Sequence, residues 1–159
     1  MTHYPFSNLS DLSFEFRTSN GIVYHAYFIA YGDLFPDYPE FAEDAYSFNL
    51  EVVIDDAEIQ ILDERVGLTV VAIFRYFFNS MQNVAIYICD SSDDRQLARK
   101  RKFDFWFWKY NDGSIVKEDG TAVIASFQIY NSLLVHKQNI FADKIITAFK
   151  ALNEKADDK

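Results

Sequence analysis

The segment with the most chemical potential is a polar turn at residues 90–96, which reads Asp-Ser-Ser-Asp-Asp-Arg-Gln. It separates an apolar run from a basic segment, so a strand-to-helix junction is expected there. The first turn of a helix leaves backbone N–H groups without partners, and these groups bind anions. The candidate ligand-binding residues, for a phosphorylated ligand, are therefore Ser91, Ser92, Arg95 and Gln96.

Three carboxylates in the same turn argue against a phosphate site. Asp90, Asp93 and Asp94 would repel phosphate and are suited to capping the helix themselves. Their spacing is not that of a known calcium loop, so no metal ion is predicted. No Walker loop or GxGxxG motif occurs either, and we predict no cofactor.

No set of residues suggests nucleophilic catalysis. His3, His25 and His136 stand apart from one another, and no GxSxG or HExxH motif is present. Cys89 ends an apolar run and is predicted to be a small core residue, because Asp90 beside it would disfavour a thiolate. No catalytic residue is predicted, and an enzyme is the less favoured interpretation.

A second candidate region is a helix expected at about 92–110, which has aromatic residues on two sides. A core-facing stripe uses only one side, so we predict an interaction surface formed by Arg99, Trp106 and Tyr110. The alternative is that Trp106 is buried on a second side of the helix. A further alternative makes residues 103–110 a strand, because their aromatics also alternate with a period of two.

The charge of the chain is unevenly distributed. Residues 1–94 hold three basic and sixteen acidic residues, a net of −13, whereas residues 95–159 hold twelve and eight, a net of +4. This asymmetry favours pairing with a second copy of the chain or with another protein. The total of −9 makes nucleic-acid binding an unfavoured function.

The elements that would position these residues can be predicted from periodicity. Residues 12–17 and 22–31 are expected to form a hairpin across Asn20-Gly21, and 46–54 a third strand. A helix capped by Asp63 is expected over about 63–79, followed by a central buried strand at 83–90. Residues 32–45, with two prolines and five acids, are too irregular for a long element.

The second half is expected to hold a hairpin, a strand and a last helix. Residues 114–118 and 121–127 are predicted to pair across Asp119-Gly120, with 128–137 as a further strand. Asn139 is expected to cap a helix over about 140–153, followed by a frayed tail. Predicted core residues are Phe74, Phe77, Ile86 and Phe149.

These elements predict one α+β domain over residues 1–159, with a core of about 4–153. The order is β-β-β-α-β-α-β-β-β-α, giving a mainly antiparallel sheet of about six to seven strands with three helices. The N-terminal sequence is unlike a secretory signal, and the longest apolar run is too short to cross a bilayer. A cytoplasmic protein without membrane contact is therefore expected.

Several sequence motifs resemble a known group of proteins. They are YPF at 4–6, FPDYPE at 35–40, ICDSSDDRQLARKRKFDFWF at 88–107, NDGS at 111–114 and SLLVHKQN at 132–139. The chain is similar over about Tyr4–Leu152 to small bacterial, Bacteroidetes-type proteins catalogued as a domain of unknown function. The resemblance implies a compact bacterial domain and assigns no activity, cofactor or site residue.

Two functions follow from the sequence. The favoured one is a non-enzymatic protein-interaction or regulatory domain, because aromatic residues and charges abound and no catalytic set is recognisable. The alternative is a small enzyme of the acyl-transfer type, which would bind a phosphorylated cofactor at residues 91–96.

Overall fold

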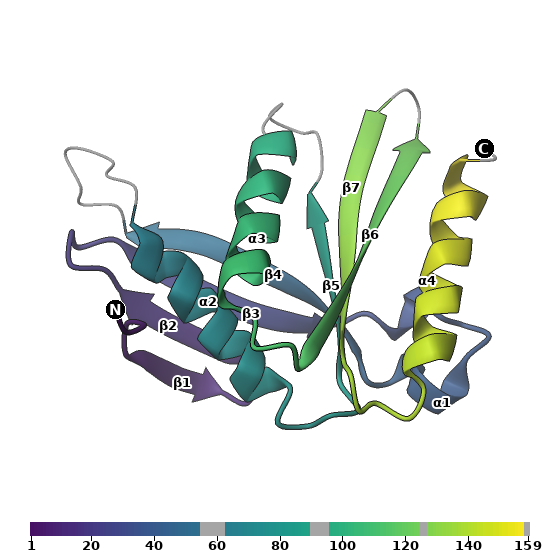
Figure 1. Ribbon diagram of the computed structural model, residues 1–159, viewed down its shortest axis with the longest axis horizontal. Helices are drawn as coiled ribbons and strands as arrows, with labels where there is room; N and C mark the ends of the chain where they lie inside the picture. The colour runs from purple at the N-terminus through teal and green to yellow at the C-terminus, as the bar shows by residue number, and fades with distance from the viewer. Residues whose placement is uncertain (55–62, 90–95, 125–126, 158–159) are drawn as a thin grey trace.

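The computed structural model describes residues 1–54, 63–89, 96–124 and 127–157. These residues form an α+β domain built on a seven-stranded sheet with the order β1-β2-β3-β4-β5-β7-β6 (Figure 1). The bounds of the strands are β1 Phe6–Ser10, β2 Ser13–Arg17, β3 Val23–Ala30, β4 Ala45–Ile54, β5 Val84–Cys89, β6 Ile115–Ile124 and β7 Phe127–His136. The helices are η1 Gly32–Leu34, α1 Pro39–Ala42, α2 Glu64–Phe77, α3 Gln96–Tyr110 and α4 Ala142–Asp157.

The first three strands form an antiparallel meander. The β2–β3 hairpin turns where Asn20-Gly21 predicts it, and Gly21 adopts a φ of +84°, which is accessible to glycine without steric cost. β1 was not predicted, because the segment before residue 12 has no clear alternation. Most residues of β1 are exposed, as expected for a strand at the edge of a sheet.

Helix α2 begins as the sequence predicts. The Asp63 carboxylate accepts a hydrogen bond from the Arg65 N–H at 3.0 Å, which caps the helix. Gly67 is a buried residue inside α2. It lies against the Trp106 indole of α3, where a Cβ atom would collide with the ring. The glycine therefore lets the two helices approach closely.

Strand β5 is central, as its continuous apolar sequence predicts. It pairs with β4 in parallel and with β7 in antiparallel orientation, and the β4–β5 contact is the parallel one in this sheet. The predicted hairpin across Asp119-Gly120 is wrong. β6 runs unbroken from Ile115 to Ile124, with Asp119 opposite Ser132 and Gly120 opposite Asn131. Gly120 has no positive φ and so makes no turn.

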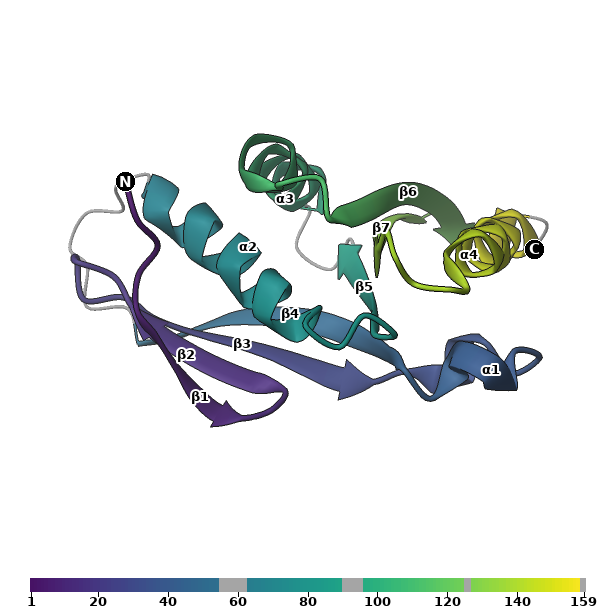
Figure 2. The same ribbon diagram turned by 60° about the horizontal axis from the view of Figure 1, so that its bottom comes forward.

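The two faces of the sheet carry different helices. α2 and α3 pack together on one face over an aromatic core, whereas α4 packs along β6 and β7 with η1 and α1 on the other (Figure 2). Alternate residues of β5 enter the two cores, Ala85 on the α2 side and Ile86 on the α4 side. All four predicted core residues are buried, namely Phe74, Phe77, Ile86 and Phe149.

The last helix is capped as predicted but is displaced and longer. The Asn139 side-chain oxygen accepts from the Phe141 N–H at 2.8 Å, and α4 starts at Ala142 and ends at Asp157. With the four-residue α1, the described chain has four α-helices where the sequence predicted three.

Candidate functional site

The residues predicted to bind a ligand are mostly outside the described part of the chain. Ser91, Ser92 and Arg95 fall there, and Gln96 is the first residue of α3. The prediction that residues 103–110 are helical is confirmed, because α3 continues to Tyr110, and the strand alternative is wrong.

The predicted interaction surface is divided by the fold. Trp106 is 7% exposed and lies in the core between α3 and α2, which is the alternative that the sequence left open. Tyr110 is half-buried beside the same core, and Arg99 is half-buried at the other end of the helix. The exposed aromatics of α3 are instead Phe105, at 46%, and Trp108, at 80%.

The site that the topology creates is a cleft between β4 and β5. The two strands pair only from Ala45 to Phe48 and from Val84 to Tyr87. β4 then continues to Ile54 alongside β3, while β5 follows β7, so their carboxyl ends point apart in Figure 1. Ligands of sheets with parallel strands commonly bind at such an opening beyond the carboxyl ends of the strands.

The cleft has a volume of about 310 Å³ and is lined from three elements. β4 supplies residues 48–51, β5 supplies Tyr87 and Ile88, and α3 supplies Arg99. Beyond Phe48, the edge of β4 that faces the opening pairs with no described strand. Among the described residues, no strand pairs with the backbone N–H and C=O groups on this edge, so an extended ligand could add to it as a further strand.

Tyr87 lines the cleft, and Cys89 is a second titratable residue of β5 that lies buried near it. Burial raises the pKa of Tyr87, and the neighbouring Cys89 adds to that shift, although Arg99 opposes it. Burial also raises the pKa of the Cys89 thiol. Both groups are therefore protonated at neutral pH, which leaves Tyr87 as a hydrogen-bond donor and removes Cys89 as a thiolate nucleophile.

The carboxylate of Glu51 is the acidic member of the lining. It accepts a hydrogen bond at 2.5 Å from the Tyr27 hydroxyl of β3, and this bond raises the pKa of Tyr27. Glu51 and Arg99 thus bring opposite charges to one cleft.

An ionic network fixes α3 against β6 and β7. The Lys100 ammonium pairs with Asp104 one turn later, and Lys117 of β6 contacts Asp104 and Asp119. The Ser132 hydroxyl of β7 donates to Asp119 at 2.8 Å. These contacts hold the helix that supplies Arg99, so their role is positional.

The histidines have local partners. His25 Nε2 lies 2.6 Å from the Ser13 hydroxyl, and His136 Nδ1 accepts from the Gln138 N–H at 3.0 Å. Within the described ranges, no group of three or more His, Cys, Asp or Glu side chains could hold a metal ion. No helix in those ranges is long and apolar enough to span a bilayer.

Comparison with known proteins places the chain in a family. Residues 62–151, from the start of α2 into α4, match the family model described as "Family of unknown function (DUF6169)". The chain belongs to this family. The match confirms the resemblance to a domain of unknown function, whereas a bacterial origin stays a prediction. Neither the curated proteins nor the solved structures contain a significant match.

The sequence contained a partial signal for the cleft. Asn49 and Glu51 are polar residues in the second half of a strand, and Tyr87 interrupts an aliphatic run. Only the parallel alignment of β4 and β5, followed by their separation, brings these residues to one opening.

Proposed function

We propose that this protein is a small enzyme of the acyl-transfer type, which binds a phosphorylated acyl carrier in the β4–β5 cleft. The observation that supports it most is the separation of two parallel strands at their carboxyl ends. Such carriers combine an extended arm that contains amides with an anionic end. The arm would form hydrogen bonds with the open edge of β4, as an added strand does.

The charges favour one end of the cleft for the anion. The first turn of α2 carries Asp63 and Glu64, which oppose a phosphate. α3 carries no acid in its first turn, and Arg99 lies one turn into it and lines the cleft. We therefore expect the phosphate group at the Arg99 side chain, because Asp90, Asp93 and Asp94 before α3 would repel it from the first turn of that helix.

Tyr87 supplies the proton that acyl transfer requires. When an amine or hydroxyl of the acceptor attacks the acyl carbon, the carbon–sulfur bond of the thioester breaks and a thiolate leaves. The phenol of Tyr87 would protonate this thiolate, and the proton lost by the acceptor would restore the phenol through water.

The experiment is a thermal-shift measurement with coenzyme A and acetyl-coenzyme A. Ligand at 100 times its Kd stabilises a protein by about 2.7 kcal/mol, which corresponds to a rise in Tm of roughly 5–11 °C for a chain of this size. Arg99→Gln should abolish the shift, whereas Arg101→Gln, an exposed arginine on the same helix, should keep it. No shift for the wild-type protein with either compound would refute the proposal.

A second function is supported by the exposed aromatics of α3. Trp108 is 80% exposed and Phe105 is 46% exposed, and their rings lie 6.0 Å apart. We propose that this face, rather than one that includes Trp106, mediates self-association or binds an acidic protein. In sedimentation velocity, Trp108→Ala should shift an assembled wild-type protein to monomer, and added salt should do the same. A wild-type protein that stays monomeric at low salt would contradict self-association.

A further inference from the structure

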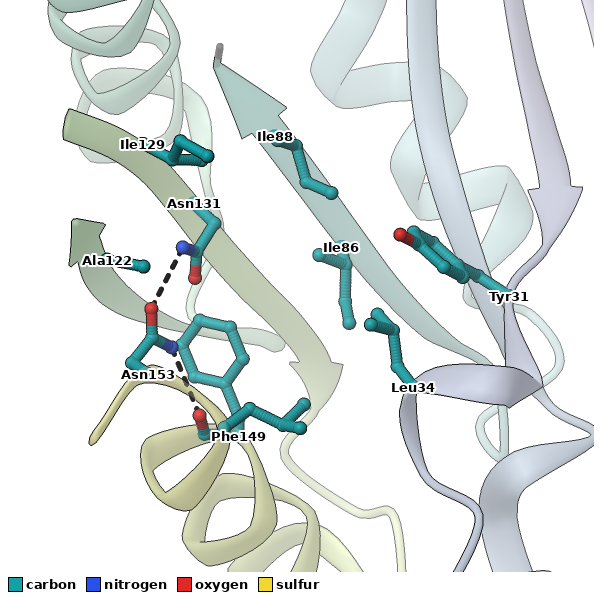
Figure 3. A pocket seen from close by; sticks show the side chains of 10 residues that line it. Tyr31, Leu34, Ile86, Ile88, Ala122, Ile129, Asn131, Phe149 and Asn153 are labelled. Atoms are coloured by element: carbon teal, nitrogen blue, oxygen red, sulfur yellow. Dashed lines mark hydrogen bonds between the residues drawn. The ribbon is translucent and has the colours of Figure 1, made fainter. Parts of the chain in front are cut away.

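A separate pocket lies on the opposite face of the sheet, between α4 and the segment around η1. Its volume is about 330 Å³, and Figure 3 shows the side chains that line it. Ile86 and Ile88 of β5 form its floor, Phe149 of α4 one wall, and Tyr31 with Leu34 the wall across from it. None of the ten described lining residues carries a charge.

One polar group in this apolar pocket has an unused acceptor. The Asn131 amide nitrogen donates to Asn153 Oδ1 at 2.9 Å, and the Asn153 amide nitrogen donates to the Phe149 carbonyl at 3.0 Å. These two bonds fix the orientation of both amides, as the dashed lines in Figure 3 show. Asn131 Oδ1 is buried and accepts no hydrogen bond from any described residue.

The backbone of β6 makes room for this pair of amides. Gly120 lies opposite Asn131, and a Cβ atom there would come within 2.7 Å of Asn131 Oδ1 and 2.5 Å of Asn153 Nδ2. A buried acceptor without a donor costs about 1–3 kcal/mol, so a structure that holds one at a pocket wall is suited to a ligand that supplies the donor.

We propose that this pocket binds a small, neutral, mainly apolar molecule that donates one hydrogen bond to Asn131 Oδ1. A charged ligand would lose its hydration among apolar side chains without an ionic partner. An apolar cavity of about 150 Å³ holds benzene, so roughly twice that volume suits a bicyclic ring or a chain of similar size. The proposal is independent of the acyl-transfer function, because Asn131 and Asn153 line this pocket and not the β4–β5 cleft, although Ile88 lines both.

The test compares two probes that differ only in a donor. 2-Naphthol and naphthalene are titrated against the intact protein by calorimetry. 2-Naphthol should bind about tenfold more tightly, the upper range for one net hydrogen bond. Asn131→Leu, which keeps the size of the side chain but removes the acceptor, should abolish this preference while naphthalene still binds.

Two further variants keep the result interpretable. Leu152→Trp fills the pocket from a half-buried position on α4 without changing the amides, and should abolish binding of both probes. Ile140→Trp adds the same side chain at a site that is 89% exposed, and should bind both probes like the wild type. The proposal is wrong if the wild-type protein binds neither probe, if it binds both equally, or if Leu152→Trp leaves binding unchanged.

Discussion

The contact between Gly67 and Trp106 gives a sharp test, because helix propensity and packing predict opposite signs. Gly67 lies inside α2, where alanine is favoured over glycine by about 1 kcal/mol. On propensity alone, Gly67→Ala should therefore stabilise the protein. In the structure, a Cβ atom at this position would lie 2.6 Å from Trp106 Cγ and even closer to two other atoms of the indole.

The structure determines which effect is larger. Trp106 is 7% exposed and packed between two helices, so its ring has little space into which it can move. Relief of the overlap requires α3 to shift away from α2, and overpacking of this kind costs about 1–3 kcal/mol or more. After the propensity gain is subtracted, we expect Gly67→Ala to lower the free energy of unfolding by up to about 2 kcal/mol.

Urea unfolding followed by circular dichroism measures this difference. Thr147→Ala, at an exposed position of α4, is the matched control and should raise stability by a few tenths of a kcal/mol. In the background of Trp106→Leu, the cost of Gly67→Ala should largely disappear, because the smaller side chain leaves space for the methyl group. If Gly67→Ala stabilises the wild-type protein as much as propensity predicts, the close approach of α2 and α3 is wrong.

Two other predictions concern the core and the ionic network. Trp106→Ala should cost roughly 3–5 kcal/mol of unfolding free energy in chemical denaturation, whereas a loss under about 1 kcal/mol would mean that the indole is not buried. Burial raises the pKa of Asp119, but hydrogen bonds from Lys117 and Ser132 outweigh this effect and lower it below the ordinary 3.8. A carboxyl group whose pKa is lower in the folded than in the unfolded state stabilises the folded protein at pH values above its unfolded pKa. This stabilisation is lost as the pH falls through the folded pKa. Asp119→Asn should therefore destabilise the protein at pH 7 and differ less from wild type near pH 3, and an equal difference at both would exclude the ion pairs.

The sequence predicted those elements whose local and tertiary preferences agree. Asn20-Gly21 both permits a tight turn and separates two alternating strands, and the β2–β3 hairpin forms there. Asp63 caps α2 with its own side chain, so the helix start depends on one local contact. Strand β5 is covered on both faces of the sheet, with Ala85 in one core and Ile86 in the other, which explains why its sequence shows no polar alternation.

The errors arose where tertiary contacts outweigh local preference. Asp119-Gly120 is a typical turn sequence, yet Asp119 is held by Lys117 and Ser132 in the middle of β6. Gly120 is needed there because two asparagine side chains occupy the space beside it. These contacts come from β7 and α4, so a pattern limited to neighbouring residues could not identify them.

The same reasoning explains why the candidate site was only partly predictable. Arg99 was selected from the sequence as part of a surface with Trp106, but the helix places the two residues in different surroundings. The cleft depends on where β4 and β5 stop pairing, and this follows from β4 staying with β3 while β5 follows β7. Because β4 follows β3 and β5 follows β7 along diverging directions, the sheet opens between β4 and β5. This opening brings Tyr87, Glu51 and Arg99 to one cleft.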